Sequence, residues 1–148
     1  MKTVFISHAL KDQRYVSQLA ASLRKEGVQV WIDEEQLQPG EDWEKSLRKG
    51  LAQSDLMLTV VGPSVDYPNV LFEAGAAIGL GKRVIFIIPE NEVKYGRFPF
   101  ALNSKNSLIR RTPTATAREL VRSEFLNSKA SPAIPQIGGS LRRVKAGR

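Results

Sequence analysis

Hydrophobic and polar residues alternate in blocks along the chain, and the blocks follow two patterns. Short apolar runs, continuous or rich in β-branched residues, are typical of strands in a buried parallel sheet. They predict strands at residues 4–6, 28–32, 56–61, 84–88 and 108–109. Apolar residues at three- and four-residue spacing predict amphipathic helices between the strands. These helices are expected at residues 12–26, 43–51, about 69–80 and 114–126.

Turn-forming residues separate these elements. Gly27 stands where the first helix is expected to stop, and Pro39-Gly40 indicates a polar loop at residues 33–42. Strands that alternate with helices predict right-handed crossovers and a parallel sheet covered on both faces. We therefore expect an α/β fold, a flavodoxin-like three-layer sandwich with a central parallel sheet flanked by helices. Its ligand site should lie beyond the carboxyl ends of the strands.

Polar residues follow the predicted strands at that edge. Ser7 and His8 come after the first strand, and Asp33 comes after the second. Glu73 belongs to the helix that follows the third strand. Phe72, Ala74 and Gly75 surround it with apolar and small neighbours, which allow a ligand to approach closely and exclude part of the water. Without further information, a helix-surface glutamate that interacts favourably with the helix dipole explains Glu73 equally well.

Composition excludes several classes of protein. The chain has 148 residues, 42% hydrophobic and 25% charged, which fits one globular domain. No apolar run approaches the roughly 20 residues that span a bilayer, and the first six residues are too short for a signal peptide. Cysteine is absent and histidine occurs once, which excludes thiolate chemistry and makes a metal centre unexpected. We expect a cytoplasmic protein with no membrane contact.

The basic charge of the chain is concentrated at one end. The net charge is +7, and residues 129–148 contain five basic residues and no acidic ones, so residues 1–128 have a net charge of only +2. The same end contains Pro132, Pro135, Gly138 and Gly139. We expect a folded domain at 1–128 and a basic, flexible tail at 129–148. Nucleic acid is not an expected partner, except through this tail.

Four segments stand in order along the chain and together cover about residues 1–127. They are Val4–Ala9 with Asp12, Val30–Asp33 with Leu37–Trp43, Ser54–Ser64, and Asn69–Ala77 with Gly81–Ile85. These segments resemble the sequence boxes of Toll/interleukin-1 receptor (TIR) domains, of the bacterial type that cleaves NAD⁺. Asn69 differs from the tryptophan that many TIR domains have four residues before their glutamate.

The resemblance implies that Glu73 is the catalytic residue of an NAD⁺ glycohydrolase or ADP-ribosyl cyclase. The chemistry is consistent with one carboxylate. Nicotinamide is a cationic leaving group and needs little acid catalysis, whereas the oxocarbenium-like ribose gains from a nearby negative charge. No glycine-rich dinucleotide or phosphate-binding fingerprint is present. NAD⁺ is therefore expected as a substrate, and no cofactor is expected.

The resemblance also implies a substrate-binding set. Each of its members has a simpler explanation as well. Ser7 and His8 would line the nicotinamide-ribose site, although His8 is equally well explained as an exposed imidazole in a turn. Asp33 would bind a ribose hydroxyl or else cap the following turn. The spacing of Trp43 with Leu47 and Leu51 favours packing, and Trp31 is expected to pack against a helix. The substrate-binding set is Ser7, His8, Asp33, Trp43 and Asn69.

Three functions stay open at this point. The first is the NAD⁺-cleaving enzyme, which the resemblance places in bacterial antiphage defence with a partner defence protein. The second is a non-catalytic TIR module that signals by association. The third is an enzyme like the nucleoside deoxyribosyltransferases, which also place a glutamate before a helix of small residues. The resemblance further implies a homo-oligomer formed through the 33–42 loop. Neither hydrolysis nor cyclisation is preferred by the sequence.

Overall fold

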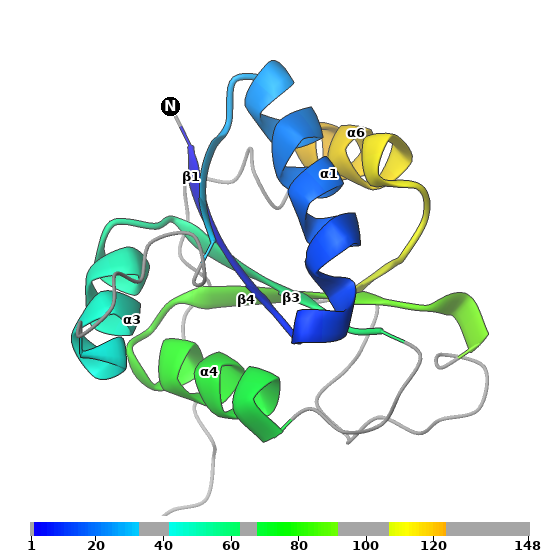
Figure 1. Cartoon of the computed structure of the whole chain (residues 1–148). Helices are drawn as coiled ribbons and strands as arrows, with labels where there is room; N and C mark the ends of the chain where they lie inside the picture. Colours follow the sequence, from blue (N-terminus) through cyan, green and yellow to red (C-terminus); the bar gives the residue numbers. More distant parts are fainter. Residues whose placement is uncertain (1, 33–41, 63–67, 92–106, 124–148) are drawn as a thin grey trace, which may run out of the picture.

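Five parallel strands form one sheet in the order β2-β1-β3-β4-β5 (Figure 1). The computed structural model describes residues 2–32, 42–62, 68–91 and 107–123. All the pairings within this part of the chain are parallel, as the alternation of strands and helices predicts. The strands are β1 Thr3–His8, β2 Gln29–Ile32, β3 Leu56–Val60, β4 Arg83–Ile88 and β5 Ser107–Ile109.

Helices cover the sheet on both faces. Helices α1 and α6 pack together on one face, and α3 and α4 lie on the other (Figure 1). This arrangement confirms the three-layer α/β fold, and the strand order is that of the flavodoxin-like class. A short 3₁₀ turn at Leu10–Asp12 precedes α1. The helices are α1 Gln13–Lys25, α3 Trp43–Ala52, α4 Pro68–Gly79 and α6 Pro113–Arg122.

The sheet separates two hydrophobic cores, because successive side chains of a strand point to opposite faces. Val4 and Ile6 of β1 belong to the core beneath α1 and α6. Phe5, between them, belongs to the core beneath α3 and α4. Trp31 is partly buried against this second core, which confirms that it packs. The face to which a β1 side chain points therefore decides which helices it can contact.

The ends of three helices follow from local residues. Gly27 has φ +85°, a conformation that favours glycine, so the stop predicted there is confirmed. Asp42 caps α3 by accepting a hydrogen bond from the Glu44 amide at 3.0 Å. The prediction that the last helix continues to Leu126 was wrong. Helix α6 ends at Arg122 because Ser123 is extended and its hydroxyl donates to the Leu120 carbonyl at 2.6 Å.

The described residues include no helix that is long and apolar enough to cross a membrane. The 33–41 part of the expected loop and the 129–148 tail lie outside the described residues. The division between a domain at 1–128 and a tail stays a prediction.

Candidate functional site

Glu73 and Ser7 meet beneath α4, although 66 positions separate them in the sequence. The Ser7 hydroxyl at the end of β1 donates a hydrogen bond to Glu73 Oε2. Ser7 is fully buried and Glu73 is 5% exposed. A carboxylate this far from water feels other charges strongly, because the effective dielectric constant around it is low. The contact gives the carboxylate a fixed orientation at the carboxyl edge of the sheet.

The position of Glu73 on its helix explains its burial. Val70, Ala74 and Ala77 of α4 pack on the sheet. Glu73 lies three residues after Val70 and four before Ala77, so it shares their face of the helix. The alternative interpretation of Glu73 as a helix-surface glutamate is therefore wrong. Packing of α4 on the sheet turns the carboxylate inward, and Phe72, its neighbour, is 61% exposed instead.

A second hydroxyl lies beside this contact. Thr59 of β3 is in register with Ser7 of β1. The neighbours of Thr59 at two-residue spacing, Met57 and Val61, both belong to the core beneath α4. Thr59 therefore faces the same side of the sheet as Ser7. It is fully buried, and sequence analysis did not identify it because it lies inside an apolar run.

A second buried carboxylate, Asp12, lies near the end of β1 and is paired with an arginine. Arg110 Nη1 donates to Asp12 Oδ1 at 2.8 Å and to the Val61 carbonyl at 3.1 Å. The same guanidinium lies over the Tyr15 ring, 3.9 Å from its centroid. This cluster connects the carboxyl ends of β1, β3 and β5. Sequence analysis missed Arg110, whose only signal was its place directly after the last strand.

The Asp12 cluster is tightly packed. A Cβ atom on Gly62 would come within 2.6 Å of both Asp12 carboxylate oxygens. The Tyr15 hydroxyl donates to the Arg111 carbonyl at 2.7 Å and shares a 2.9 Å hydrogen bond with Thr116. Burial raises the pKa of Tyr15 above its ordinary value of 10.0, against the lowering effects of Thr116 and Arg110. These contacts give the cluster a structural role.

The structure brings together only part of the expected substrate-binding set. Ser7 lies on Glu73, whereas His8 follows it in the strand and is half-buried on the opposite face, the face of Ile6 and Val60. Trp43 begins α3 and Asn69 lies in the first turn of α4, but their side chains lie outside the description. Asp33 lies outside the described residues. The binding roles of these residues stay predictions.

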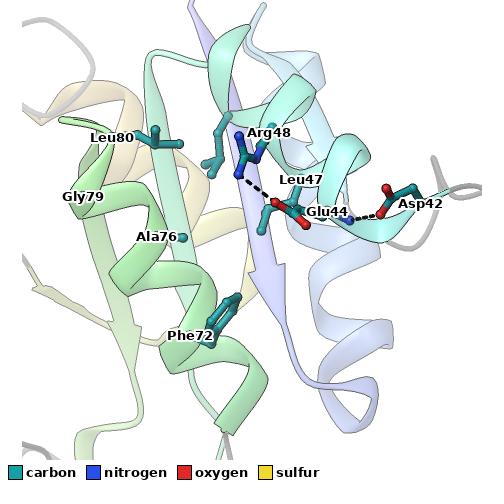
Figure 2. Close-up of a pocket in the computed structure, with 9 residues that line it drawn as sticks. Asp42, Glu44, Leu47, Arg48, Phe72, Ala76, Gly79 and Leu80 are labelled. Atoms are coloured by element: carbon teal, nitrogen blue, oxygen red, sulfur yellow. Dashed lines mark hydrogen bonds and ion pairs between the residues drawn. The ribbon is translucent and has the colours of Figure 1, made fainter.

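A groove of about 640 Å³ lies between α3 and α4, on the outer side of α4 (Figure 2). Phe72, Ala76 and Leu80 form its α4 wall. Its α3 wall consists mainly of Leu47, Leu51 and the exposed Glu44–Arg48 ion pair at 2.7 Å, with Asp42 beside it. Neither Glu73 nor Ser7 lines this groove, because the two residues meet between α4 and the sheet. The groove and the carboxylate are therefore separate features.

The described residues contain no group of three or more histidine, cysteine, aspartate or glutamate side chains that could hold a metal ion. Among the described contacts, Ser7 brings a hydroxyl to the Glu73 carboxylate, and the Thr59 hydroxyl lies on the same side of the sheet. Such groups can orient a sugar and stabilise a positive charge that develops on it. The fold and the site together define a doubly wound α/β domain with an oriented, buried carboxylate at the carboxyl edge of its sheet.

Comparison with known proteins identifies the family. The TIR domain family model matches residues 4–120, so the chain belongs to the TIR domain family. The NAD(+) hydrolase PdTIR of Paracoccus denitrificans (strain Pd 1222) is 41% identical over 59 residues, which are 39% of this chain and 20% of that protein. The 2′ cyclic ADP-D-ribose synthase BtTIR of Bacteroides thetaiotaomicron is 38% identical over 61 residues, 40% of this chain and 21% of that protein. The matches span about a fifth of these relatives' length.

Solved structures share the fold. The CMP N-glycosidase BcmB of Clostridium botulinum has a TM-score of 0.55 and 22% identity, and the likeness covers 81% of this chain and 98% of that one. The TIR domain of the Toll-related receptor TRR-2 of Hydra magnipapillata has a TM-score of 0.53 and 17% identity, with 79% of this chain and 89% of that one covered. At these identities the likeness concerns the fold alone.

Proposed function

We propose that this chain cleaves the bond between nicotinamide and ribose in NAD⁺, with Glu73 as the catalytic carboxylate. The observation on which the proposal rests is the buried Glu73 carboxylate, oriented by the Ser7 hydroxyl at the carboxyl edge of the sheet. Relatives named as an NAD(+) hydrolase and a cyclic ADP-ribose synthase support the choice of substrate. The antiphage setting and the partner defence protein stay predictions of the resemblance, and the cytoplasmic location stays a prediction from composition.

The proposed reaction uses the charge of Glu73. The bond between ribose C1′ and the nicotinamide nitrogen breaks, and its electron pair neutralises the positive charge of the leaving nicotinamide. The ribose becomes oxocarbenium-like, and a nearby carboxylate stabilises that positive charge most strongly where water is excluded. Ser7 is a neutral donor, so it orients the carboxylate without cancelling its charge. Water, or a hydroxyl or nitrogen of the ADP-ribose itself, then attacks C1′ and loses a proton.

The burial of Glu73 sets a condition on this function. A catalytic carboxylate must touch the ribose, and Glu73 is only 5% exposed in this structure. The proposal therefore requires a substrate-admitting state in which the carboxyl edge opens or Glu73 changes rotamer. We expect hydrogen exchange at the amide groups of α4 to change when NAD⁺ is added to Glu73→Gln protein, which binds without turnover.

The direct test is to incubate the purified chain with NAD⁺ and to identify products by chromatography and mass spectrometry. Release of nicotinamide with ADP-ribose indicates hydrolysis, and release with a cyclic product indicates cyclisation. Glu73→Gln is expected to lose the activity. CMP and deoxynucleosides form a second substrate arm, because the fold is also that of a CMP N-glycosidase. Turnover of NAD⁺ by folded Glu73→Gln protein would overturn the assignment.

A non-catalytic interaction module is the second candidate. The observation that favours it is the groove between α3 and α4, with Phe72 61% and Leu80 59% exposed. Exposed apolar surface of this kind often marks a contact with another protein. A purified chain that leaves NAD⁺, CMP and deoxynucleosides unchanged at every protein concentration would favour this candidate.

A further inference from the structure

Thr59 of β3 has a buried hydroxyl whose role the described contacts do not explain. The residue is fully buried, and its Oγ1 has no hydrogen-bond partner among the residues that the structure describes. A buried hydroxyl without a partner destabilises the folded state, because nothing compensates its loss of hydration, so such groups are uncommon in native proteins. Valine has nearly the same shape and would avoid the cost. The stability of this state of the protein therefore does not explain why residue 59 is a threonine.

The position of Thr59 supplies the explanation. Thr59 and Ser7 are paired residues on adjacent parallel strands, and both face α4. Adjacent strands lie about 4.8 Å apart, so the two residues lie side by side beneath the helix. Ser7 donates its hydrogen bond to Glu73 Oε2 on this side of the sheet. A modest change in the Glu73 side chain would bring its carboxylate from one hydroxyl toward the other.

We propose that Thr59 is a positioning residue for Glu73, and that its hydroxyl donates to the Glu73 carboxylate in the substrate-bound state. The inference rests on the proposed function. Ser7 holds the carboxylate in the closed state that the structure shows. Thr59 receives it when the side chain moves to meet the ribose, so the carboxylate keeps a protein donor throughout. The cost of the unpaired hydroxyl in the closed state is then offset in the state that reacts.

The test compares Thr59→Val with Thr59→Ser. Valine keeps the shape and removes the hydroxyl, so we expect kcat for NAD⁺ cleavage to fall about tenfold, with KM changed less than twofold. Serine restores the hydroxyl and should restore most of the kcat. The melting temperature of Thr59→Val should equal or exceed that of the wild type, because a hydroxyl without a partner is replaced by a methyl group.

A matched control comes from the same face of β1. Thr3 is also buried, but its hydroxyl donates to Gln29 Oε1 at 3.1 Å, at the opposite end of the strand from Ser7. Thr3→Val should lower the melting temperature and leave kcat unchanged. The two threonines thus separate the loss of a structural hydrogen bond from the loss of a positioning hydroxyl.

The outcomes distinguish this inference from the proposed function. A wild-type chain that does not cleave NAD⁺ overturns both. An active wild type with an unchanged kcat in Thr59→Val overturns the role of Thr59 alone. An equal loss of kcat in Thr59→Val and Thr59→Ser also overturns it, because the hydroxyl would not be the cause. A lower melting temperature of Thr59→Val would show that the hydroxyl already has a partner in the closed state.

Discussion

Asp12 and Glu73 are the two buried carboxylates of the described residues, and they lie at the same edge of the sheet on opposite sides of it. Asp12 is 4% exposed and Glu73 is 5% exposed. Asp12 receives a hydrogen bond from the Arg110 guanidinium, which also contacts the Val61 carbonyl and the Tyr15 ring. Glu73 receives the neutral hydroxyl of Ser7. Two groups with the same chemistry and burial are thus held by different donors.

The difference between the two donors suits Asp12 to a structural role and Glu73 to the proposed chemical one. Arg110 neutralises the charge of Asp12 and ties three strand ends together, so the pair stabilises the edge and offers little charge to a ligand. Ser7 orients Glu73 without adding a positive charge of its own. Burial of a charged group requires strong compensation, which Asp12 obtains from an ion. Glu73, whose described donor is the neutral Ser7 hydroxyl, is therefore better suited than Asp12 to stabilise a cationic sugar.

Replacing each carboxylate by the corresponding amide should give the largest effects. One variant should lose activity and the other should lose stability. We expect Glu73→Gln to lose activity by about 100-fold or more, while its unfolding free energy changes little. Asp12→Asn should instead lose about 3 kcal/mol of stability, because Arg110 is left without its counter-charge. Urea unfolding and the NAD⁺ assay on both variants measure the two effects. Comparable loss of activity per folded molecule in Asp12→Asn would break the distinction.

A methyl group at Gly62 should disturb the Asp12 side selectively. Its Cβ would lie 2.6 Å from the Asp12 carboxylate, so Gly62→Ala should cost about 1–3 kcal/mol. Gly75 is the matched control, since it lies exposed on α4 with no atom within 4 Å of an added Cβ. Gly75→Ala should raise stability by up to about 1 kcal/mol. Equal effects of the two substitutions in thermal unfolding would show that the contact with Asp12 can relax freely.

The assembly through residues 33–42, which the resemblance implies, bears on the proposed activity and not on the Asp12 cluster. We expect specific activity to rise with protein concentration, and a Pro39→Ala, Gly40→Ala double variant to weaken this rise. The reason is that the 33–42 segment is acidic, with Glu41 and Asp42 among its residues, and could bind basic residues of a second chain. A head-to-tail contact of this kind builds open strips. Activity assays across a range of concentrations, with light scattering on the same samples, measure it. A flat profile in both proteins would mean that one chain holds a complete site.

Alkaline pH should lower the unfolding free energy, because Tyr15, which belongs to the Asp12 cluster, then loses its proton. Its pKa is raised by burial, so the folded chain holds the phenol proton more tightly than the unfolded chain does. By linkage, the stabilisation that the protonated Tyr15 phenol gives the folded chain is complete below pH 10. It is lost as the pH rises through the higher pKa of the folded state. Urea unfolding at pH 9 to 11 should show this decline, and Tyr15→Phe should lack it. An identical decline in both proteins would assign it to other groups.

Removing the tail should have the smallest effect. A chain truncated after Ala130 retains both carboxylate clusters, and residues 131–148 lack the apolar periodicity needed to offset the entropy of ordering. Its melting temperature should match that of the full chain. A large drop in melting temperature would mean that the tail packs against the domain.

The order of the strands and helices was predictable because it depends on short-range patterns. The apolar runs gave the five strands, and three- and four-residue spacing gave the helices, with errors of a few residues at their ends. The four TIR-like segments also predicted Ser7 and Glu73 as site residues, although the role of each awaits experiment. Local residues decide these features, so one sequence contains enough information for them.

Only the tertiary structure decided which polar groups meet. Asp12 and Arg110 are 98 positions apart, and nothing in the residues around them indicates an ion pair. Thr59 reads as one more residue of a buried strand until the register places it beside Ser7. Glu73 becomes a buried carboxylate because α4 docks with its Val70–Ala77 face on the sheet. Long-range packing selects these partners, and its free energy depends on shapes and distances that do not exist until the chain has folded.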